Sequence, residues 1–480
     1  MLFSSPLFLF FFLPIFFITY YLVPNRQRYK NIVALVASII FFSWGEPIYV
    51  FILLGTSFID WQIGKKICQD SQVSLTQKQI FLIIGISYNL LILIFSKYLK
   101  FLIVDCFHLN ALFSFDVTQF SDLPLVLGVS FITFHKISFF VDMYTNGFKN
   151  RLPSFVDFLL YIFLFPQLIA GPIVRYHLIG EQIQKREKSY NDFINGFERF
   201  LIGMFKKVVV ADLLGVYVDQ VFNHNLNDFS TFSCWIAILS YSLQIYYDFS
   251  GYSDMACGLA KTMGFTFPEN FNQPYLAKSI TDFWQRWHMS LSGWMKQYLY
   301  IPLGGNKLGK IRGYINLWIV FIISGLWHGA SWNFVLWGAY HGFFLSLEKT
   351  MIFKEVAKIL KLPTWINQVL TFLIIMFGWV FFRSPNLNFA FNFIKKLFTL
   401  DSQSIYLPTY IYFTNELIFI LILASFFAFI SKQKFRMFML AKTQLLEFNF
   451  VKLITMLILL LLVISGMLVN SFSPFLYFRF

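Results

Sequence analysis

The 480-residue chain contains 58% hydrophobic and 21% aromatic residues but only 13% charged ones. Soluble proteins carry about 25% charged residues, so this composition indicates a protein whose main solvent is a lipid bilayer. The net charge of +14 comes from short basic clusters between apolar runs, which is typical of cytoplasmic loops and argues against a nucleic-acid partner.

Apolar runs long enough to cross or enter a bilayer recur along the whole chain. They lie at residues 2–23, 31–55, 80–104, 123–143, 155–176, 200–222, 231–260, 313–345, 366–382, 415–431 and 452–470. We therefore expect an all-α, multi-pass membrane protein with about 10 to 11 spans or re-entrant helices. Because no internal repeat or low-complexity linker divides the chain, residues 1–470 are expected to form one membrane domain, followed by a tail at 471–480.

The basic clusters predict how the chain is oriented. Basic residues follow the first apolar run at 26–30, form a group of six at 278–312, and precede the last run at 432–442. The positive-inside rule places all three clusters on the cytoplasmic side of the membrane. The last apolar run then carries the tail to the outer side.

One apolar run is interrupted near its middle. Pro166, Gly171 and Pro172 fall within residues 155–176, and proline removes a helical hydrogen bond. Broken backbone at membrane depth must line a cavity or be covered by protein. We expect the helix to break here.

A histidine lies deep inside an almost uncharged stretch. His328 is near the middle of residues 314–340, about 20 Å from the start of that stretch at about 1.5 Å per helical residue. An ionisable side chain at that depth is costly to bury, which makes it a functional candidate. Its neutral imidazole could take a proton from an attacking hydroxyl, with Gly325 and Gly329 leaving room for a substrate. The alternative is an imidazole that only packs against neighbours such as Trp327.

A second histidine lies in a basic, aromatic stretch. Trp284, Arg286 and Trp287 precede His288, so this stretch could be the approach to an active site. Tryptophan and arginine are also ordinary interfacial anchors, which is the alternative interpretation. His341 lies thirteen residues after the first candidate histidine and is turned off its helical face, so we expect it to serve packing.

Two carboxylates lie in or near another apolar run. Asp248 and Asp254 could orient a histidine or bind a cation, but six residues apart they do not share one helical face. A hydrogen-bonded plug between helices is an equally good explanation.

Signals for metal and cofactor chemistry are missing from the sequence. The four cysteines have neither C-x-x-C nor metal-ligand spacing, and no G-x-S-x-G or phosphate-binding glycine loop occurs. We expect no metal and no tightly bound cofactor.

The last six residues of the C-terminal tail carry a single hydroxyl group among aromatic residues. Pro474 ends the last apolar run, and Tyr477 lies within the final six residues, Phe-Leu-Tyr-Phe-Arg-Phe. The simpler interpretation of this tail is an apolar terminus in the headgroup layer.

Taken together, the motifs resemble the membrane-bound O-acyltransferase superfamily, and in particular its bacterial branch that O-acetylates extracytoplasmic polysaccharides such as alginate and peptidoglycan. The resemblance covers most of the chain. The segments that carry it occur in the expected order: Phe165–Tyr176, Tyr247–Asp254, Asn270–Phe271 with Pro274–Tyr275, Phe283–Ser292, Tyr300–Gly305 and Leu326–Gly329.

The resemblance implies a fold and a set of roles. The fold would be a ring of tilted helices around a central funnel, with His328 as the catalytic histidine and His288 as the second active-site histidine. The tail resembles the acyl-accepting C-terminal motif of this branch, so Tyr477 would carry the acyl group. We assign substrate contacts to five residues: Trp284, Arg286, Trp287, Trp327 and Asp248.

The same resemblance implies the donor and the partners. The donor would be acetyl-CoA or another acetyl thioester on the cytoplasmic side of the inner membrane. The partner would be a periplasmic SGNH-type acetyltransferase, through which the protein acts indirectly on an extracytoplasmic polysaccharide. A charged carrier cannot cross about 30 Å of hydrocarbon, whereas an acetyl group on a tyrosine can be handed through a short channel. The competing interpretations are a transporter for an anionic or glycan solute and a scaffold that recruits a periplasmic enzyme.

Overall fold

The computed structural model describes residues 1–68, 74–107, 128–146, 152–187, 189–399, 414–431, 448–469 and 475–476. Helices dominate this part of the chain, and no strand occurs within it. The all-α expectation is therefore confirmed for these residues.

The chain divides into two compact units. Unit 1 comprises Met1–Phe200 with Ser253–Pro268, and unit 2 comprises Leu201–Tyr252 with Glu269–Phe480. We describe each unit by itself, and the expectation of one membrane domain over residues 1–470 stays a prediction.

Unit 1 begins with two helices joined by a short loop and continues through a series of longer ones. In chain order its helices are η1 (Phe8–Phe12), α1 (Leu13–Leu22), α2 (Gln27–Ser43), α3 (Tyr49–Cys68), α4 (Leu75–Leu93), η2 (Ile94–Tyr98), η3 (Phe101–Cys106), α7 (Val129–Asn146), α8 (Phe155–Phe163), α9 (Phe165–Leu168) and α10 (Tyr176–Gln184). Helices α11 (Tyr190–Phe205) and α13 (Thr231–Thr262) each contain residues of both units.

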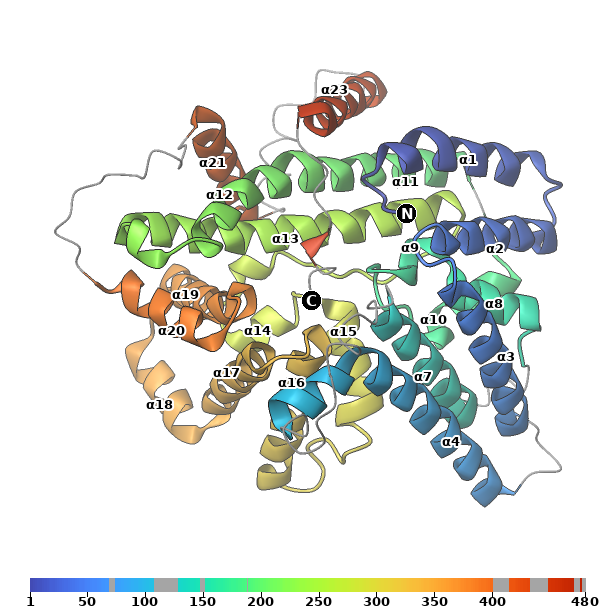
Figure 1. Cartoon of the computed structure of the whole chain (residues 1–480), viewed down its shortest axis with the longest axis horizontal. Helices are drawn as coiled ribbons and strands as arrows, with labels where there is room; N and C mark the ends of the chain where they lie inside the picture. The colour runs from blue at the N-terminus through green and yellow to red at the C-terminus, as the bar shows by residue number, and fades with distance from the viewer. Residues whose placement is uncertain are drawn as a thin grey trace. The chain divides into compact units, whose positions relative to one another are not determined.

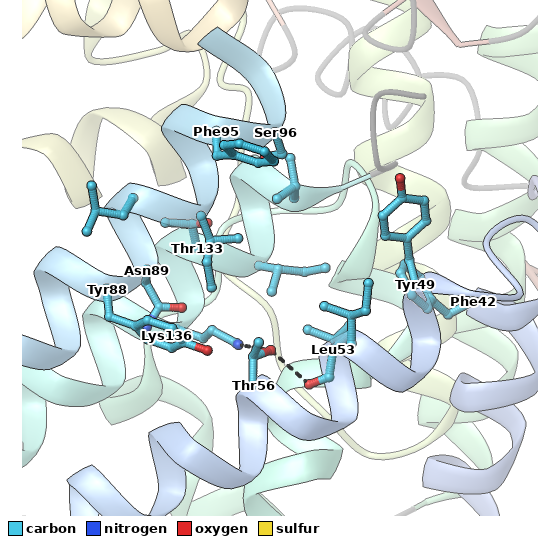
Figure 2. A pocket seen from close by; sticks show the side chains of 15 residues that line it. Phe42, Tyr49, Leu53, Thr56, Tyr88, Asn89, Phe95, Ser96, Thr133 and Lys136 are labelled. Atoms are coloured by element: carbon cyan, nitrogen blue, oxygen red, sulfur yellow. Dashed lines mark hydrogen bonds between the residues drawn. The ribbon is translucent and has the colours of Figure 1, made fainter. Parts of the chain in front are cut away.

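Helices α3, α4 and α7 pack side by side in unit 1, and α2 packs against α8 (Figure 1). A buried ion pair lies between α3 and α7, where Lys136 Nζ is 2.6 Å from Asp60 Oδ2. Lys136 Nζ also donates to Thr56 Oγ1 at 2.9 Å, and Asn89 Nδ2 of α4 donates to Asp60 Oδ1 at 2.7 Å. Figure 2 shows Lys136, Thr56 and Asn89 among mostly apolar side chains that line a cavity of about 460 Å³.

The predicted interruption of the run at 155–176 is confirmed. Helix α8 ends at Phe163, the four residues of α9 follow with Pro166 in the first turn, and no helix resumes before Tyr176. Gly171 accounts for part of the break, because a Cβ at this position would lie only 2.4 Å from the carbonyl oxygen of Pro166. The backbone can fold back on itself here only without a side chain.

Unit 2 holds the remaining helices. They are η5 (Lys206–Ala211), α12 (Asp212–Phe222), η6 (Leu226–Asp228), η7 (Pro274–Leu276), α14 (Ile280–Trp284), α15 (Met289–Met295), η8 (Lys296–Tyr300), α16 (Lys310–His328), α17 (Trp332–Lys349), α18 (Met351–Leu360), α19 (Thr364–Arg383), α20 (Leu387–Leu397), α21 (Asn415–Phe429) and α23 (Phe448–Val469).

Helices α16 and α17 form the tightest helix pair of unit 2 (Figure 1). A Cβ on Gly325 would lie 2.2 Å from the carbonyl oxygen of Phe334, and one on Gly338 would lie 2.3 Å from that of Phe321. These two glycines therefore let the two backbones approach closely. Helix α19 packs on α17, α20 packs on α19, α21 packs on α12, and α23 packs on η5.

Two helices in the described part of the chain are long and apolar enough to cross a membrane. They are Leu75–Tyr98, which joins α4 and η2, and α19, whereas the apolar helices Phe8–Leu22, Asn415–Phe429 and Leu453–Leu468 are shorter. Each predicted apolar run contains a helix, but the runs at 31–55 and 313–345 are each divided into two helices. The number of spans stays a prediction, and the basic cluster at 432–442 lies outside the described residues.

Candidate functional site

His288 occupies the tight turn between α14 and α15. Its backbone is left-handed (φ 44°, ψ 52°), a conformation that costs about 1 kcal/mol for a residue with a Cβ. Asn270 holds the turn from both sides: its carbonyl oxygen accepts from the Met289 N–H at 3.0 Å, and its Oδ1 accepts from the Ser290 N–H at 3.2 Å. Strain that neighbouring hydrogen bonds maintain in this way is common at functional sites.

The His288 ring is fully buried. Its turn lies outside the two helices that are long enough to span a membrane. Burial disfavours the charged imidazolium and lowers the pKa of His288 to about 3. The ring is therefore neutral near pH 7 and can act through hydrogen bonds rather than as a cation.

His328 is the last residue of α16, and this corrects its predicted place in the middle of a continuous helix. Gly329 follows in an extended conformation (φ −163°, ψ 147°), and Ser331 is the N-cap of α17. The apolar run thus breaks directly after the histidine. A helix end leaves backbone carbonyls unsatisfied within the helix, so the surroundings of His328 are more polar than the hydropathy of the run suggests.

Aromatic rings surround His328. Its ring centroid lies 4.9 Å from that of Trp327, 5.0 Å from that of Trp337 and 5.1 Å from that of Phe382. The residue retains 5% of its accessible surface. The His328 ring therefore packs among three aromatic rings and keeps a small exposed area.

The prediction that Gly325 and Gly329 leave room for a substrate is wrong. A Cβ on Gly329 would lie 2.1 Å from the Phe334 ring, and the space beside Gly325 is filled by the Phe334 backbone. Both glycines instead allow α17 to pack closely against the end of α16.

Trp327 connects the two histidines. Its ring centroid lies 6.0 Å from that of His288 and 4.9 Å from that of His328. Two histidines forty residues apart in the sequence therefore share one aromatic neighbour. His341 lies 5.0 Å from the Trp337 ring and 5.1 Å from the Trp284 ring, and its packing role stays a prediction.

The two tryptophans near His288 belong to the core of unit 2. Trp287 is almost fully buried and lies 5.0 Å from both Phe271 and Trp379. Trp284 packs edge-on against Trp337 at 5.6 Å, and its indole N–H has no hydrogen-bond partner among the described residues. A buried indole N–H without a partner is a donor that a substrate could use. The assignment of both residues to substrate binding stays a prediction.

Arg286 braces the loop that precedes His288. Its Nε donates to Asp282 Oδ1 at 2.6 Å, and its Nη1 donates to the carbonyl oxygen of Asn272 at 3.3 Å. The side chain is about one-third exposed. The arginine therefore supports the turn, and its predicted contact with substrate remains untested.

Asp248 belongs to a buried charge cluster that the sequence did not reveal. Its Oδ1 lies 2.7 Å from Lys207 Nζ, and the same ammonium lies 2.6 Å from Asp212 Oδ1. Lys207 comes from η5 and Asp212 begins α12. A lysine inside the apolar run at 200–222 was the available signal, because a charge there needs a buried partner. Asp254, by contrast, belongs to unit 1, where its Oδ1 accepts from Arg199 Nη2 at 2.8 Å.

Two residues of the C-terminal tail dock beside this cluster. The Leu476 N–H donates to Asp248 Oδ2 at 2.9 Å. Phe475 stacks on Tyr252 with centroids 4.7 Å apart and lies 5.8 Å from Phe249. Phe249 in turn contacts the His288 ring edge-on at 4.6 Å. One ring thus separates the tail from His288, while Tyr477 itself lies outside the described residues.

Within the described residues, no group of three or more His, Cys, Asp and Glu side chains is arranged to hold a metal ion. The side chains described at the site are imidazole rings, a buried carboxylate and hydrogen-bond donors such as the Trp284 indole. This set suits proton transfer during attack of a hydroxyl on an acyl group.

Comparison with known proteins identifies the family to which this chain belongs. Residues 148–391 match the family model of MBOAT, the membrane-bound O-acyltransferase family, and this region contains both histidines and Asp248. The chain is 38% identical over 402 residues to the probable alginate O-acetylase AlgI of Pseudomonas aeruginosa, covering 84% of the chain and 76% of the relative. It is 40% identical over 401 residues to the probable AlgI of Pseudomonas syringae, covering 83% and 75%. It is 35% identical over 434 residues to the peptidoglycan O-acetyltransferase of Helicobacter pylori, covering 84% and 81%.

Proposed function

Because the chain belongs to the membrane-bound O-acyltransferase family and is an O-acyltransferase, we propose that it moves an acetyl group across the inner membrane by way of Tyr477. A cytoplasmic acetyl thioester is the donor, and the final acceptor is an extracytoplasmic polysaccharide. His328 is the base and His288 assists.

The observation that carries this proposal is the position of the docked tail. Phe475 lies one aromatic ring away from His288, and Trp327 links His288 to His328. Tyr477 directly follows the docked residues in the sequence, and this adjacency supports the assignment of the accepting hydroxyl to it.

The proposed reaction has two transfers. In the first, Oη of Tyr477 attacks the thioester carbonyl carbon while His328 takes the hydroxyl proton, the carbon–sulfur bond breaks, and the proton passes to the departing thiolate. In the second, the acetyl ester moves from Tyr477 to a hydroxyl of the polymer, and the tyrosine oxygen regains a proton. Tyrosine suits the relay because its hydroxyl, with an ordinary pKa of about 10, leaves more readily than that of serine.

The relatives support an acetyl group and an exported polymer. Two carry names for alginate acetylation and one for peptidoglycan acetylation, and each covers more than 80% of this chain. We infer that a periplasmic SGNH-type acetyltransferase takes the group from the tyrosine and selects the polymer. The transfer from the thioester to Tyr477 would then be the same whichever polymer is acetylated. This agrees with the names of the relatives, which refer to two different polysaccharides.

The relay also requires that the chain be oriented in one direction across the membrane. We propose that the helices form a ring around a funnel, with the basic cluster at 278–312 on the cytoplasmic side and the tail on the outer side. The donor and the tyrosine then reach the histidines from opposite compartments. Cysteine labelling from each side of the membrane at exposed positions such as Lys307 tests this topology.

The relay is tested by replacing the accepting hydroxyl. Tyr477→Phe should abolish both acetyl-tyrosine in the purified protein and acetyl groups on the cell's exported polysaccharide, because no other tail residue carries a phenol. Tyr190→Phe, at an exposed tyrosine of α11, is the matched control and should acetylate normally. Wild-type acetylation in the Tyr477→Phe variant would rule out the relay.

The base is tested at His328. His328→Ala should lower the rate of acetyl-tyrosine formation by at least about 100-fold, the usual contribution of general base catalysis. His341→Ala removes an equally buried imidazole on the other side of Trp337 and should retain activity in proportion to the folded protein recovered. Equal rates in the two variants would end the assignment of His328 as the base.

A further inference from the structure

We infer that Asp248, held by Lys207, is the anchor of the C-terminal tail: it positions the tail through the Leu476 N–H and takes no part in the chemistry itself. The ion pair between Lys207 Nζ and Asp248 Oδ1 is 2.7 Å long, and the hydrogen bond from Leu476 to Asp248 Oδ2 is 2.9 Å long. The carboxylate therefore joins η5, α13 and the tail through its two oxygens.

The burial of Asp248 explains why it binds a backbone N–H. Its Oδ1 faces the ammonium of Lys207, which also lies 2.6 Å from Asp212 Oδ1. Lys207 and Asp248 are both buried, so Asp248 needs its further donor from the protein. A buried carboxylate is stable only when its oxygens are hydrogen-bonded, and the Leu476 N–H is a donor that the end of the chain provides.

Aromatic packing adds a second attachment point next to the first. Phe475 is 2% exposed and stacks on Tyr252, with Phe249 on its other side. Phe249 follows Asp248 directly, so one turn of α13 supplies both the polar and the aromatic contact. The two contacts together hold residues 475 and 476 against α13.

The anchor has a consequence for the relay, and this part of the inference rests on the proposed function. In the proposed relay, the residue after the anchored pair, Tyr477, accepts the acetyl group. Anchoring residues 475 and 476 would lower the entropy cost of bringing this acceptor to the donor. Asp248 is accordingly a positioning residue, and its predicted role in binding the substrate is replaced by binding the tail.

The anchor itself is tested by hydrogen exchange, with no dependence on activity. In the full-length protein, the Leu476 amide should exchange at least about tenfold more slowly than in the Asp248→Ala variant, as expected for a hydrogen bond to a charged acceptor. Asp248→Ala leaves Lys207 balanced by Asp212, so the fold should survive. Asp248→Asn keeps an acceptor oxygen and should retain more protection than Asp248→Ala. Equal exchange in the wild type and Asp248→Ala would overturn the anchor.

The positioning role is tested by removing the donor instead of the acceptor. Leu476→Pro deletes the N–H without changing Asp248 or Tyr477, and Leu476→Met keeps it as the matched control. Compared at equal amounts of folded protein, we expect acetyl-tyrosine to form at least about tenfold more slowly in Leu476→Pro and at the wild-type rate in Leu476→Met.

The two experiments separate the two proposals. Rapid acetyl-tyrosine formation in both Leu476→Pro and Asp248→Ala would overturn the positioning role while leaving the relay intact. If the wild-type protein forms no acetyl-tyrosine at all, the proposed function fails, and the exchange of the Leu476 amide still decides whether the anchor exists.

Discussion

Two buried ion pairs in the described part of the chain differ in what completes their hydrogen bonds. In unit 1, Lys136 meets the carboxylate of Asp60, and side chains of α3 and α4 also bond to this pair. In unit 2, Lys207 meets the carboxylate of Asp248, which also accepts a donor from the C-terminal tail. The first pair is bonded by side chains of neighbouring helices, whereas the second binds a segment from a distant part of the sequence.

The two pairs also differ in the residues that lie around them. Lys136 borders a cavity with mostly apolar walls, and no histidine is among the described residues that line it (Figure 2). Asp248 directly precedes Phe249, which touches both His288 and Phe475. The pair that binds the tail is therefore the one next to the candidate active site.

The largest expected effect comes from removing the cation of the pair that binds the tail. Lys207→Met leaves the buried carboxylate of Asp248 without its ammonium and also removes the cation that faces Asp212. Losing one partner of a buried pair costs about 3–5 kcal/mol. We expect a lower yield of folded protein and a lower melting temperature in detergent than for Lys136→Met. A Lys207→Met protein that melts with or above Lys136→Met would show that the contact of Lys207 with a second carboxylate is unimportant for stability.

The next effect concerns the ion pair of unit 1. Lys136→Met alone should destabilise by about 3–5 kcal/mol, and adding Asp60→Asn should restore most of that loss, because no buried charge then remains. The carboxamide introduced by Asp60→Asn would keep an acceptor oxygen for the side-chain amide of Asn89. Thermal unfolding of the two single variants and the double variant gives the coupling energy directly. Additive losses would mean that the pair contributes no specific coupling.

The smallest effect is expected at Asp212. Asp212→Asn keeps an acceptor beside Lys207, so we expect a change in stability of only about 1 kcal/mol. The tail should stay docked, because Asp248 retains its partner. Hydrogen exchange at Leu476 measures this, and a loss of protection there would show that Asp212, rather than Asp248 alone, holds the tail.

Much of the local structure followed from the sequence. Helices formed within the predicted apolar runs, and the helix broke at the prolines at 166 and 172 where expected. These features depend on hydropathy over a window and on proline, both of which are readable from neighbouring residues.

Other features were predicted wrongly or missed. Gly325 and Gly329 were expected to leave open space, but small residues in a helix give room to whichever element packs there, and here α17 fills it. His328 was expected inside a continuous helix, because hydropathy does not register an extended glycine within an apolar run. Lys207 was not identified as the partner of Asp248, since forty-one sequence positions separate them.

The sequence by itself therefore determined the helical, membrane-type character of this chain, its family, and the two histidines and the tail tyrosine as the residues to test. These properties are carried by composition and by short motifs. Only the tertiary structure decided that Lys207, Asp212 and Asp248 form one buried cluster and that Leu476 donates to it. Electrostatic partners are chosen by distance in space and by exclusion from water, and neither quantity can be calculated from the order of the residues alone.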